Sequence, residues 1–234
     1  MKKQIRRLVY PLLCVMFLAG AMLGLSGPAS AGPTEPLSSL AAGDTVSFAG
    51  YTWIVLDNGA ASGSSYLLMQ EALKDSGGNY LNMAFDSNLV PSFKNSTSIS
   101  GYLNSTFLGS LPKAAQALIQ EHAWGAGGID THGSGSGSSA TVSDYIGLIS
   151  YSDCHTTYSK YVSNLTDVNG WWTLTPVSGS PGGVWFVGPN VSLDYVDAND
   201  TFAGTTEALR PALYLSSATL VSGGNGGAVA TSAD

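Results

Sequence analysis

Apolar and polar residues alternate along three short runs near the beginning of the chain. The runs are Thr45 to Phe48, Tyr51 to Asp57 and Ser65 to Gln70, and they are separated by Ala49-Gly50 and by a turn rich in Gly and Ser. Alternation directs successive side chains to opposite faces of a strand, and short turn-forming breaks favour antiparallel neighbours. The pattern therefore predicts an N-terminal antiparallel meander.

Helical spacing replaces this alternation in the middle of the chain. Apolar residues recur three or four positions apart in Ser98 to Leu108 and in Pro112 to His122, where the proline suits the first turn of a helix. Ser150 and Asp153 have the spacing of a capping box, which predicts a further helix from Tyr151 to about Tyr161. We therefore expect two to three short helices.

Strand-like runs return in the last third of the chain. Strands are predicted at Trp171–Leu174, Gly183–Val187, Val191–Val196 and Leu209–Leu215, with a short buried strand before them at Tyr145–Ile149. Residues 74–95 and 125–140, which are rich in Gly and Ser, are predicted to be loops. The expected fold class is α+β, with the N-terminal meander, the short helices and irregular C-terminal β-strands in that order.

The chain divides by composition into four parts. Residues 1–31 have the features of a secretory signal peptide, namely four basic residues, an apolar run and a small-residue cleavage signal, and an uncleaved membrane anchor is the alternative. Residues 32–42 are expected to be a linker, residues 43–220 the folded domain, and residues 221–234 a flexible Gly-rich tail. We therefore expect a secreted, extracellular or cell-surface protein that meets the membrane only transiently, through its signal peptide.

Cleavage of that peptide changes the charge of the chain. It removes four of the nine basic residues and none of the sixteen acidic ones, so the mature chain keeps five basic residues and carries a net charge of −11. An acidic surface repels a phosphate backbone, which argues against a nucleic-acid partner. Cys154 is the only cysteine left in the mature sequence, so no intramolecular disulfide is expected.

Several motifs occur in an order known from a group of secreted bacterial domains. They are GDTVSFAGYTWIVLD, SISGYLNSTF with its Tyr-Leu-Asn, the junction IGLIS, the Trp171-Trp172 pair followed by Pro176, and the closing ALRPALYLSS. On these motifs, which cover about residues 43–217, the chain resembles a bacterial family of unknown function that is similar to the C-type-lectin-like and formylglycine-generating-enzyme-like folds. The resemblance implies a C-type-lectin-like domain in an extracellular setting and no established activity.

The resemblance has one departure. The family usually has Trp-Trp-Leu-Arg-Ser-Pro, whereas this chain has Trp-Trp-Thr-Leu-Thr-Pro from Trp171 to Pro176, so no role of that arginine transfers to it. The formylglycine-generating relatives depend on copper bound by cysteines. A single mature cysteine cannot supply their paired ligands, which argues against that activity.

The residues that would indicate an enzyme form no convincing constellation. Cys154 stands next to His155 in the first turn of a predicted helix, where the helix dipole would favour a thiolate. Adjacent side chains on a helix diverge by about 100°, however, and a semi-buried structural cysteine is the preferred interpretation. No catalytic residue and no cofactor is therefore predicted.

Metal binding has one candidate segment. The three histidines match no zinc spacing. The stretch DYVDANDTF gathers the hard oxygen ligands that calcium takes, at Asp194, Asp197, Asn199 and Asp200. It lacks the glycine and the final glutamate of an EF-hand loop, so a solvated acidic turn is preferred and calcium is the alternative.

Aromatic residues and polar loops near the C-terminus are the candidates for ligand binding. Successive residues of a strand point to opposite faces, so one of Trp171 and Trp172 can face a ligand, although most of these rings are expected in the core. The loops of residues 188–206 are rich in Asn, Asp, Ser and Tyr, which make adaptable polar contacts. The predicted ligand-binding residues are Trp172, Trp185, Asn190, Asp194, Tyr195, Asp197 and Asn199.

These observations predict a non-enzymatic binding domain whose loops between Trp171 and Thr206 bind an extracellular glycan or protein. One alternative is a structural or adhesive surface component without a small-molecule site. Another is a hydrolase that acts on glycans through carboxylates such as Asp194 and Asp197.

Overall fold

The computed structural model shows a mixed α+β protein made mostly of β-sheet with a few short helices. It describes residues 34–87, 92–94, 96–129, 140–180, 182–189, 193–195 and 206–222, with only the backbone for 193–195 and Ser222. The predicted signal peptide, residues 1–31, and the predicted tail beyond Ser222 lie outside these residues.

The predicted meander is present and forms one half of the largest sheet. Its strands are β2 (Thr45–Phe48), β3 (Tyr51–Asp57) and β4 (Ser64–Met69), each antiparallel to the next. β14 (Pro211–Ser216) and β6 (Ile119–Gln120) continue the sheet in the order β2-β3-β4-β14-β6, and β9 (Ile146–Leu148) also pairs with β14. The strands at residues 45–57 match their predicted bounds.

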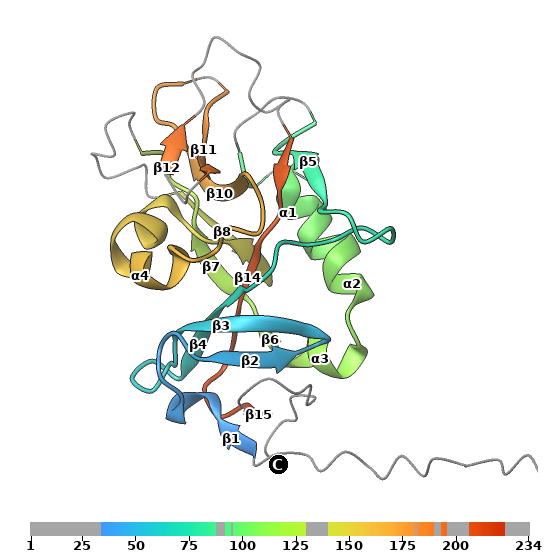
Figure 1. Ribbon diagram of the computed structural model, residues 1–234, viewed down its shortest axis with the longest axis vertical. Helices are drawn as coiled ribbons and strands as arrows, with labels where there is room; N and C mark the ends of the chain where they lie inside the picture. The colour runs from blue at the N-terminus through green and yellow to red at the C-terminus, as the bar shows by residue number, and fades with distance from the viewer. Residues whose placement is uncertain are drawn as a thin grey trace, which may run out of the picture. The chain divides into compact units, whose positions relative to one another are not determined.

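Strand β14 holds this sheet together. It pairs antiparallel with β4, β6 and β9. In Figure 1 the red β14 lies beside the blue strands of the meander, although the two come from opposite ends of the chain. Apolar and polar residues hardly alternate along β14, because other parts of the protein cover both faces of this strand.

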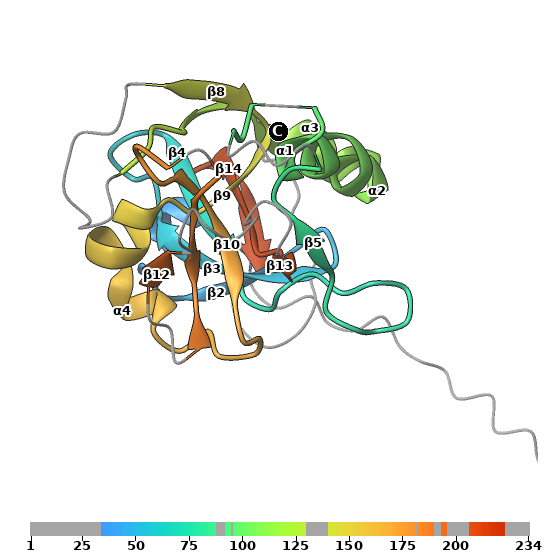
Figure 2. The ribbon, with the colours of Figure 1, turned by 90° about the horizontal axis from the view of Figure 1, so that it is seen from above.

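A second sheet contains the predicted C-terminal strands. Its order is β12-β11-β10-β13-β5, formed by Leu193–Tyr195, Val184–Val187, Trp171–Pro176, Thr206–Ala208 and Asn82–Ala84. β10 and β13 run parallel, and the other pairs are antiparallel. The prediction of a loop throughout residues 74–95 is wrong at β5. This short segment is a strand because it pairs antiparallel with β13 (Figure 2).

The predicted helices are present but short. The first is a continuous helical run of α1 (Ile99–Tyr102), the π-helical turn Leu103–Phe107 and α2 (Leu108–Ser110), capped by Ser98, whose hydroxyl accepts from the Ser100 amide. The predicted helix that begins at Tyr151, the third along the chain, contains the π-helical turn Asp153–Thr157 and α4 (Ser159–Val162). The second, α3 (Lys113–Leu118), ends before the predicted His122 because the chain turns into β6 and then β7 (His122–Gly125), which pairs with β8 (Thr141–Asp144).

Residues 34–42 of the predicted linker are part of the fold. β1 (Thr34–Pro36) pairs antiparallel with β15 (Leu220–Ser222), and the 3-10 turn Leu37–Ser39 follows it. Leu37 is fully buried, and the Leu37 amide donates to the Thr219 carbonyl at 3.0 Å. Residues 34–42 of the predicted linker therefore belong to the folded part, and strand pairing extends past residue 220, because β15 gives this segment a partner that its composition alone does not reveal.

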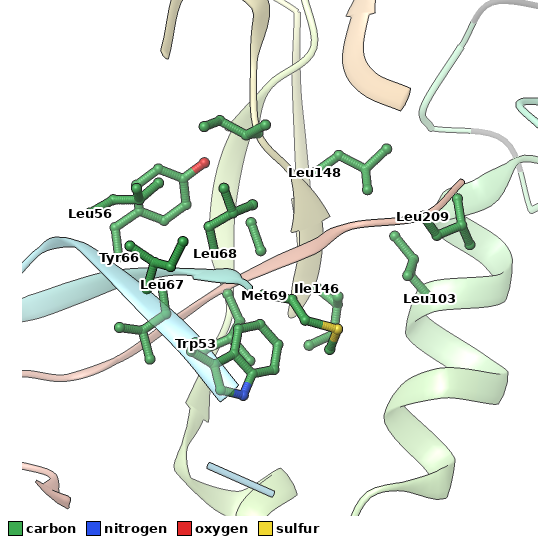
Figure 3. Close-up of a cluster of buried hydrophobic side chains, with 14 of the residues drawn as sticks. Trp53, Leu56, Tyr66, Leu67, Leu68, Met69, Leu103, Ile146, Leu148 and Leu209 are labelled. Atoms are coloured by element: carbon green, nitrogen blue, oxygen red, sulfur yellow. The ribbon is translucent and has the colours of Figure 1, made fainter. Parts of the chain in front are cut away.

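The core is made of side chains from both halves of the chain. Figure 3 shows Trp53, Leu67 and Met69 of the meander together with Ile146 and Leu148 of β9 and Leu103 of the first helical run. Trp53 is fully buried, and its indole Nε1 donates to the Phe48 carbonyl at 2.9 Å. Packing from distant segments, without a disulfide, stabilises the domain.

The turn between β2 and β3 offers a test of this register. Ala49 and Gly50 both have positive φ, 53° and 86°, the combination that a two-residue type I′ hairpin requires. Alanine is costly in this region, whereas asparagine tolerates it. We expect Ala49→Asn to raise the free energy of unfolding by about 1 kcal/mol, measured by urea denaturation.

Helix α3 provides the matched control for that change. Ala114 is exposed in α3, where asparagine has a lower helix propensity than alanine. Ala114→Asn is expected to lower stability by about half a kcal/mol. Loss of stability in both variants would contradict the assigned turn.

Candidate functional site

The tryptophans predicted to face a ligand lie in the interior. Trp172 is 0% exposed and Trp185 is 3% exposed. The Trp172 indole Nε1 donates to the Met83 carbonyl at 2.9 Å, and the Trp185 Nε1 donates to the Ile129 carbonyl at 3.3 Å. The prediction that these two rings bind a ligand is therefore wrong, and the neighbouring Trp171, at 1% exposed, is buried as well.

The reason lies in how β10 is covered. Successive side chains of the strand do point to opposite faces, but both faces carry packed side chains. The Trp172 ring makes edge contacts with Phe85 and Phe186, with ring centroids 5.6 and 6.4 Å away. On the other face, Trp171 packs against the Arg210 guanidinium.

The other predicted binding residues belong to the C-terminal loops. Asn190, Asp197, Asn199 and the additional calcium candidate Asp200 lie outside the described residues. Asp194 and Tyr195 lie in β12, whose backbone pairs with β11 through Asp194↔Phe186 and Tyr195↔Trp185. Binding by these loops stays a prediction.

A polar groove lies at the end of the meander. It has a volume of about 560 Å³. Three segments line it, namely the start of β3, the chain that leaves β4, and the loop between α4 and β10. We call this the β3–β4 groove; its lining residues are Gly50, Tyr51, Thr52, Met69, Gln70, Glu71, Ala72, Lys74, Asn164, Leu165, Thr166 and Asp167.

One buried arginine holds these segments together beneath the groove. Arg210 precedes β14, and its side chain is fully buried. Its Nη1 donates to the Met69 carbonyl at 3.1 Å and to the Gln70 carbonyl, and its Nη2 makes a salt bridge with Asp167. The guanidinium therefore fixes the chain leaving β4 against the loop that carries Asp167.

Asp167 makes a second connection between the same two walls. Its Oδ2 accepts a hydrogen bond from the Ala72 amide at 2.8 Å. Burial lowers the pKa of Arg210, and the nearby Asp167 carboxylate acts in the opposite direction. An arginine in this setting keeps its charge, so the buried guanidinium pairs with a carboxylate whose side chain is 20% exposed.

Burial of this ion pair leaves some donors without acceptors. The Arg210 Cζ lies 5.1 Å from the centroid of the Trp171 ring, a cation–π contact. Among the described residues, the Arg210 Nε and the Trp171 Nε1 have no hydrogen-bond partner. The site therefore depends on the remaining bonds of the guanidinium to offset its desolvation.

A second, smaller hollow contains the cysteine. It has a volume of about 290 Å³ and is lined in part by Tyr151, Cys154 and His155. Burial raises the pKa of the Cys154 thiol well above its ordinary value, which disfavours the thiolate. His155 stacks on Tyr151, with centroids 5.3 Å apart. The helix dipole therefore does not activate this thiol, and a structural cysteine fits the environment.

Tyr66 and Tyr214 of the largest sheet lie near the half-buried carboxylate of Asp153, which belongs to the π-helical turn Asp153–Thr157. Tyr66 and Tyr214 stack with centroids 4.6 Å apart, and His122 stacks on Tyr214 at 3.7 Å. Burial raises the pKa of Asp153, and burial together with the Asp153 charge raises the pKa of Tyr158 to about 12. These tyrosines therefore stay neutral at physiological pH.

The described residues contain no group of three or more His, Cys, Asp or Glu side chains placed to hold a metal ion. The calcium candidates lie in the C-terminal loops discussed above. Within the same part of the chain, no helix has the length and apolar character needed to cross a bilayer.

Sequence reasoning missed the residues of the β3–β4 groove. One residue in the sequence could have pointed to them. Arg210 is the single charged residue in the apolar run from Ala208 to Leu215. A charged residue in a buried run needs a partner, so this arginine indicates that an acidic side chain lies beside it. The sequence does not say which of the sixteen acidic residues that partner is.

Comparison of the chain with models of protein families, with curated proteins and with solved structures finds no match.

Replacement of Asp167 tests the role of the ion pair. Asp167→Asn keeps an oxygen for the Ala72 amide but leaves the buried guanidinium without a counter-charge. We expect a loss of about 3 kcal/mol in the free energy of unfolding, measured by urea denaturation. Glu71→Gln, which breaks an exposed pair with Lys74, is the control and should change stability little.

The half-buried carboxylate of Asp153 leads to a pH-dependent prediction. Its folded pKa is raised above the ordinary 3.8, so the folded state holds the proton more tightly and stability falls as pH rises through the window above 3.8. Asp153→Asn removes this penalty. We expect the variant to gain stability relative to the wild type between about pH 3.5 and pH 7, measured as the urea midpoint at each pH. A difference that is the same at both pH values would contradict the assignment.

Proposed function

We propose that this protein is a secreted or cell-surface bacterial ligand-binding domain that binds an extracellular glycan or protein without catalysis. The observation that carries the proposal is the β3–β4 groove, a preformed hollow of about 560 Å³. Sites for small ligands are concave, of this size range, and largely formed before the ligand arrives. The groove is concave and of this size, and the ion pair of Arg210 and Asp167 holds its walls in place before any ligand arrives.

The floor and the rim of the groove differ in a way that suits binding. Met69 and Ala72 are 2% exposed and Leu165 is 7% exposed, so the floor is part of the packed interior. The rim carries exposed polar side chains, including Thr52, Gln70 and Asn164. A rigid floor reduces the ordering cost of binding, and the polar rim supplies hydrogen bonds.

The charges in the groove support binding over catalysis. Asp167 accepts hydrogen bonds from Arg210 and from the Ala72 amide, and Glu71 pairs with Lys74 at 2.9 Å. A hydrolase needs a carboxylate that is able to take or give a proton at the reacting bond. Both carboxylates here already have cationic partners.

The C-type-lectin-like fold and the extracellular location are part of this proposal. The succession of a meander, short helices and C-terminal strands supports the fold, together with the motif pattern that ends in ALRPALYLSS. The predicted signal peptide at residues 1–31 supports secretion. The predicted binding loops between Trp171 and Thr206 offer a second surface for the same function.

An array of glycans and peptides, probed with the purified protein, tests the proposal. Thr166→Arg places a long side chain in the β3–β4 groove, and we expect it to abolish a saturable signal of the wild type. Thr141→Arg makes the same change at an exposed position of β8 that does not line the groove, and it should leave the signal intact. Circular dichroism and urea denaturation check that both variants fold.

Other outcomes lead to different conclusions. Loss of the signal in Tyr195→Ala or Asp197→Ala, with Thr166→Arg still binding, would move the site to the C-terminal loops. Self-association without any binding would favour a structural or adhesive component. Turnover of a glycan that disappears in Asp194→Asn would establish a hydrolase and overturn the proposal.

A further inference from the structure

The formal charges that line or support the β3–β4 groove cancel in pairs. Arg210 neutralises Asp167 from below, and Lys74 neutralises Glu71 on the rim. A site for a charged ligand presents an excess of the opposite charge, which attracts that ligand and rejects others. The groove has no such excess, although the mature chain as a whole is acidic.

The polar groups that are left over are amides and hydroxyls. The side chains of Thr52, Gln70, Asn164 and Thr166 are exposed and make no hydrogen bond to another described residue. Amide side chains offer donors and an acceptor, and hydroxyls offer both in one group. This set matches a ligand whose own groups are hydroxyls, each able to donate and to accept.

One wall of the groove is aromatic. Tyr51 is half-buried, and its ring makes a T-shaped contact with Phe107, with centroids 5.6 Å apart. Tyr51 is one of the residues that line the groove, and the contact with Phe107 restricts the motion of its ring, which lowers the entropic cost of packing a ligand on it. The C–H faces of a sugar ring pack on such a ring while its hydroxyls reach the polar rim.

We infer that the β3–β4 groove binds an uncharged carbohydrate, as a short segment of a glycan. The inference rests on the proposed function and narrows its ligand from a glycan or protein to one chemical class. A protein partner would need about 800 Å² of contact on each side, far more than this hollow offers by itself. The compensated charges, the unpaired amides and hydroxyls, and the Tyr51 ring together favour a neutral sugar over a peptide.

Isothermal titration with defined oligosaccharides tests the inference. The neutral probes are cellotriose, maltotriose and chitotriose, and the comparison probes are an oligogalacturonate and a lysine-containing tripeptide. We expect at least one neutral probe to bind with an affinity that hardly changes up to about 1 M salt, because no charge pairing contributes. The charged probes should not bind in the groove.

A matched pair of variants places the binding in the groove. Asn164→Asp keeps the shape of the side chain but removes two N–H donors and adds a charge, so the affinity for the neutral probe should fall about tenfold. Asn82→Asp makes the same change at an exposed position of β5 outside the groove and should not alter the affinity. Tyr51→Phe, which keeps the ring, should weaken binding less than Tyr51→Ala.

The remaining outcomes separate this inference from the proposed function. If a charged probe or the peptide binds and Thr166→Arg abolishes that binding, the groove is a binding site but the carbohydrate inference is wrong. If neutral oligosaccharides bind equally well to Asn164→Asp and Thr166→Arg, they bind elsewhere and the inference is again wrong. If array ligands bind but none responds to a groove variant, the carbohydrate inference fails and the proposed function stands on the C-terminal loops. If no probe and no array ligand binds at all, both proposals fail.

Discussion

The buried guanidinium of Arg210 is the constraint on which the rest of the structure depends. It stands at the start of β14, the strand that joins the meander to β6 and β9. From there it bonds the carbonyls at the end of β4, pairs with Asp167 after α4, and packs on Trp171 at the start of β10. The two sheets and the loop after α4 therefore meet at one charge, and removal of Asp167 leaves the guanidinium buried and uncompensated.

The same constraint shapes the surface above it. The chain leaving β4 and the loop before β10 diverge at the surface, and Asp167 fixes the separation between them through Arg210 and the Ala72 amide. The β3–β4 groove is the space that this separation leaves. A groove formed in this way has a floor under strong packing constraints, whereas its rim of exposed amides and hydroxyls can vary without loss of the fold.

Local patterns predicted the parts of the fold whose order arises locally. Alternation and the Ala49-Gly50 turn determine β2 and β3, and helical spacing with Ser98 as the cap determines the first helical run. The predictions that failed all concern partners distant in the chain. β5 exists because β13 pairs with it, β1 because β15 does, and the second helix ends where β6 joins β14. Pairing energy between distant strands overrides weak local preference.

The sequence by itself determined the α+β composition, the meander, and the presence of an isolated arginine in a buried apolar run, since these follow from periodicity and from the cost of burying charge. Only the tertiary structure decided which acidic residue pairs with that arginine and which faces of β10 are covered. Trp172 and Trp185 are strand residues by pattern, but their burial depends on Phe85, Phe186 and Tyr151, which come from other segments. Exposure and the shape of a groove are properties of several segments at once, so no single stretch of sequence contains them.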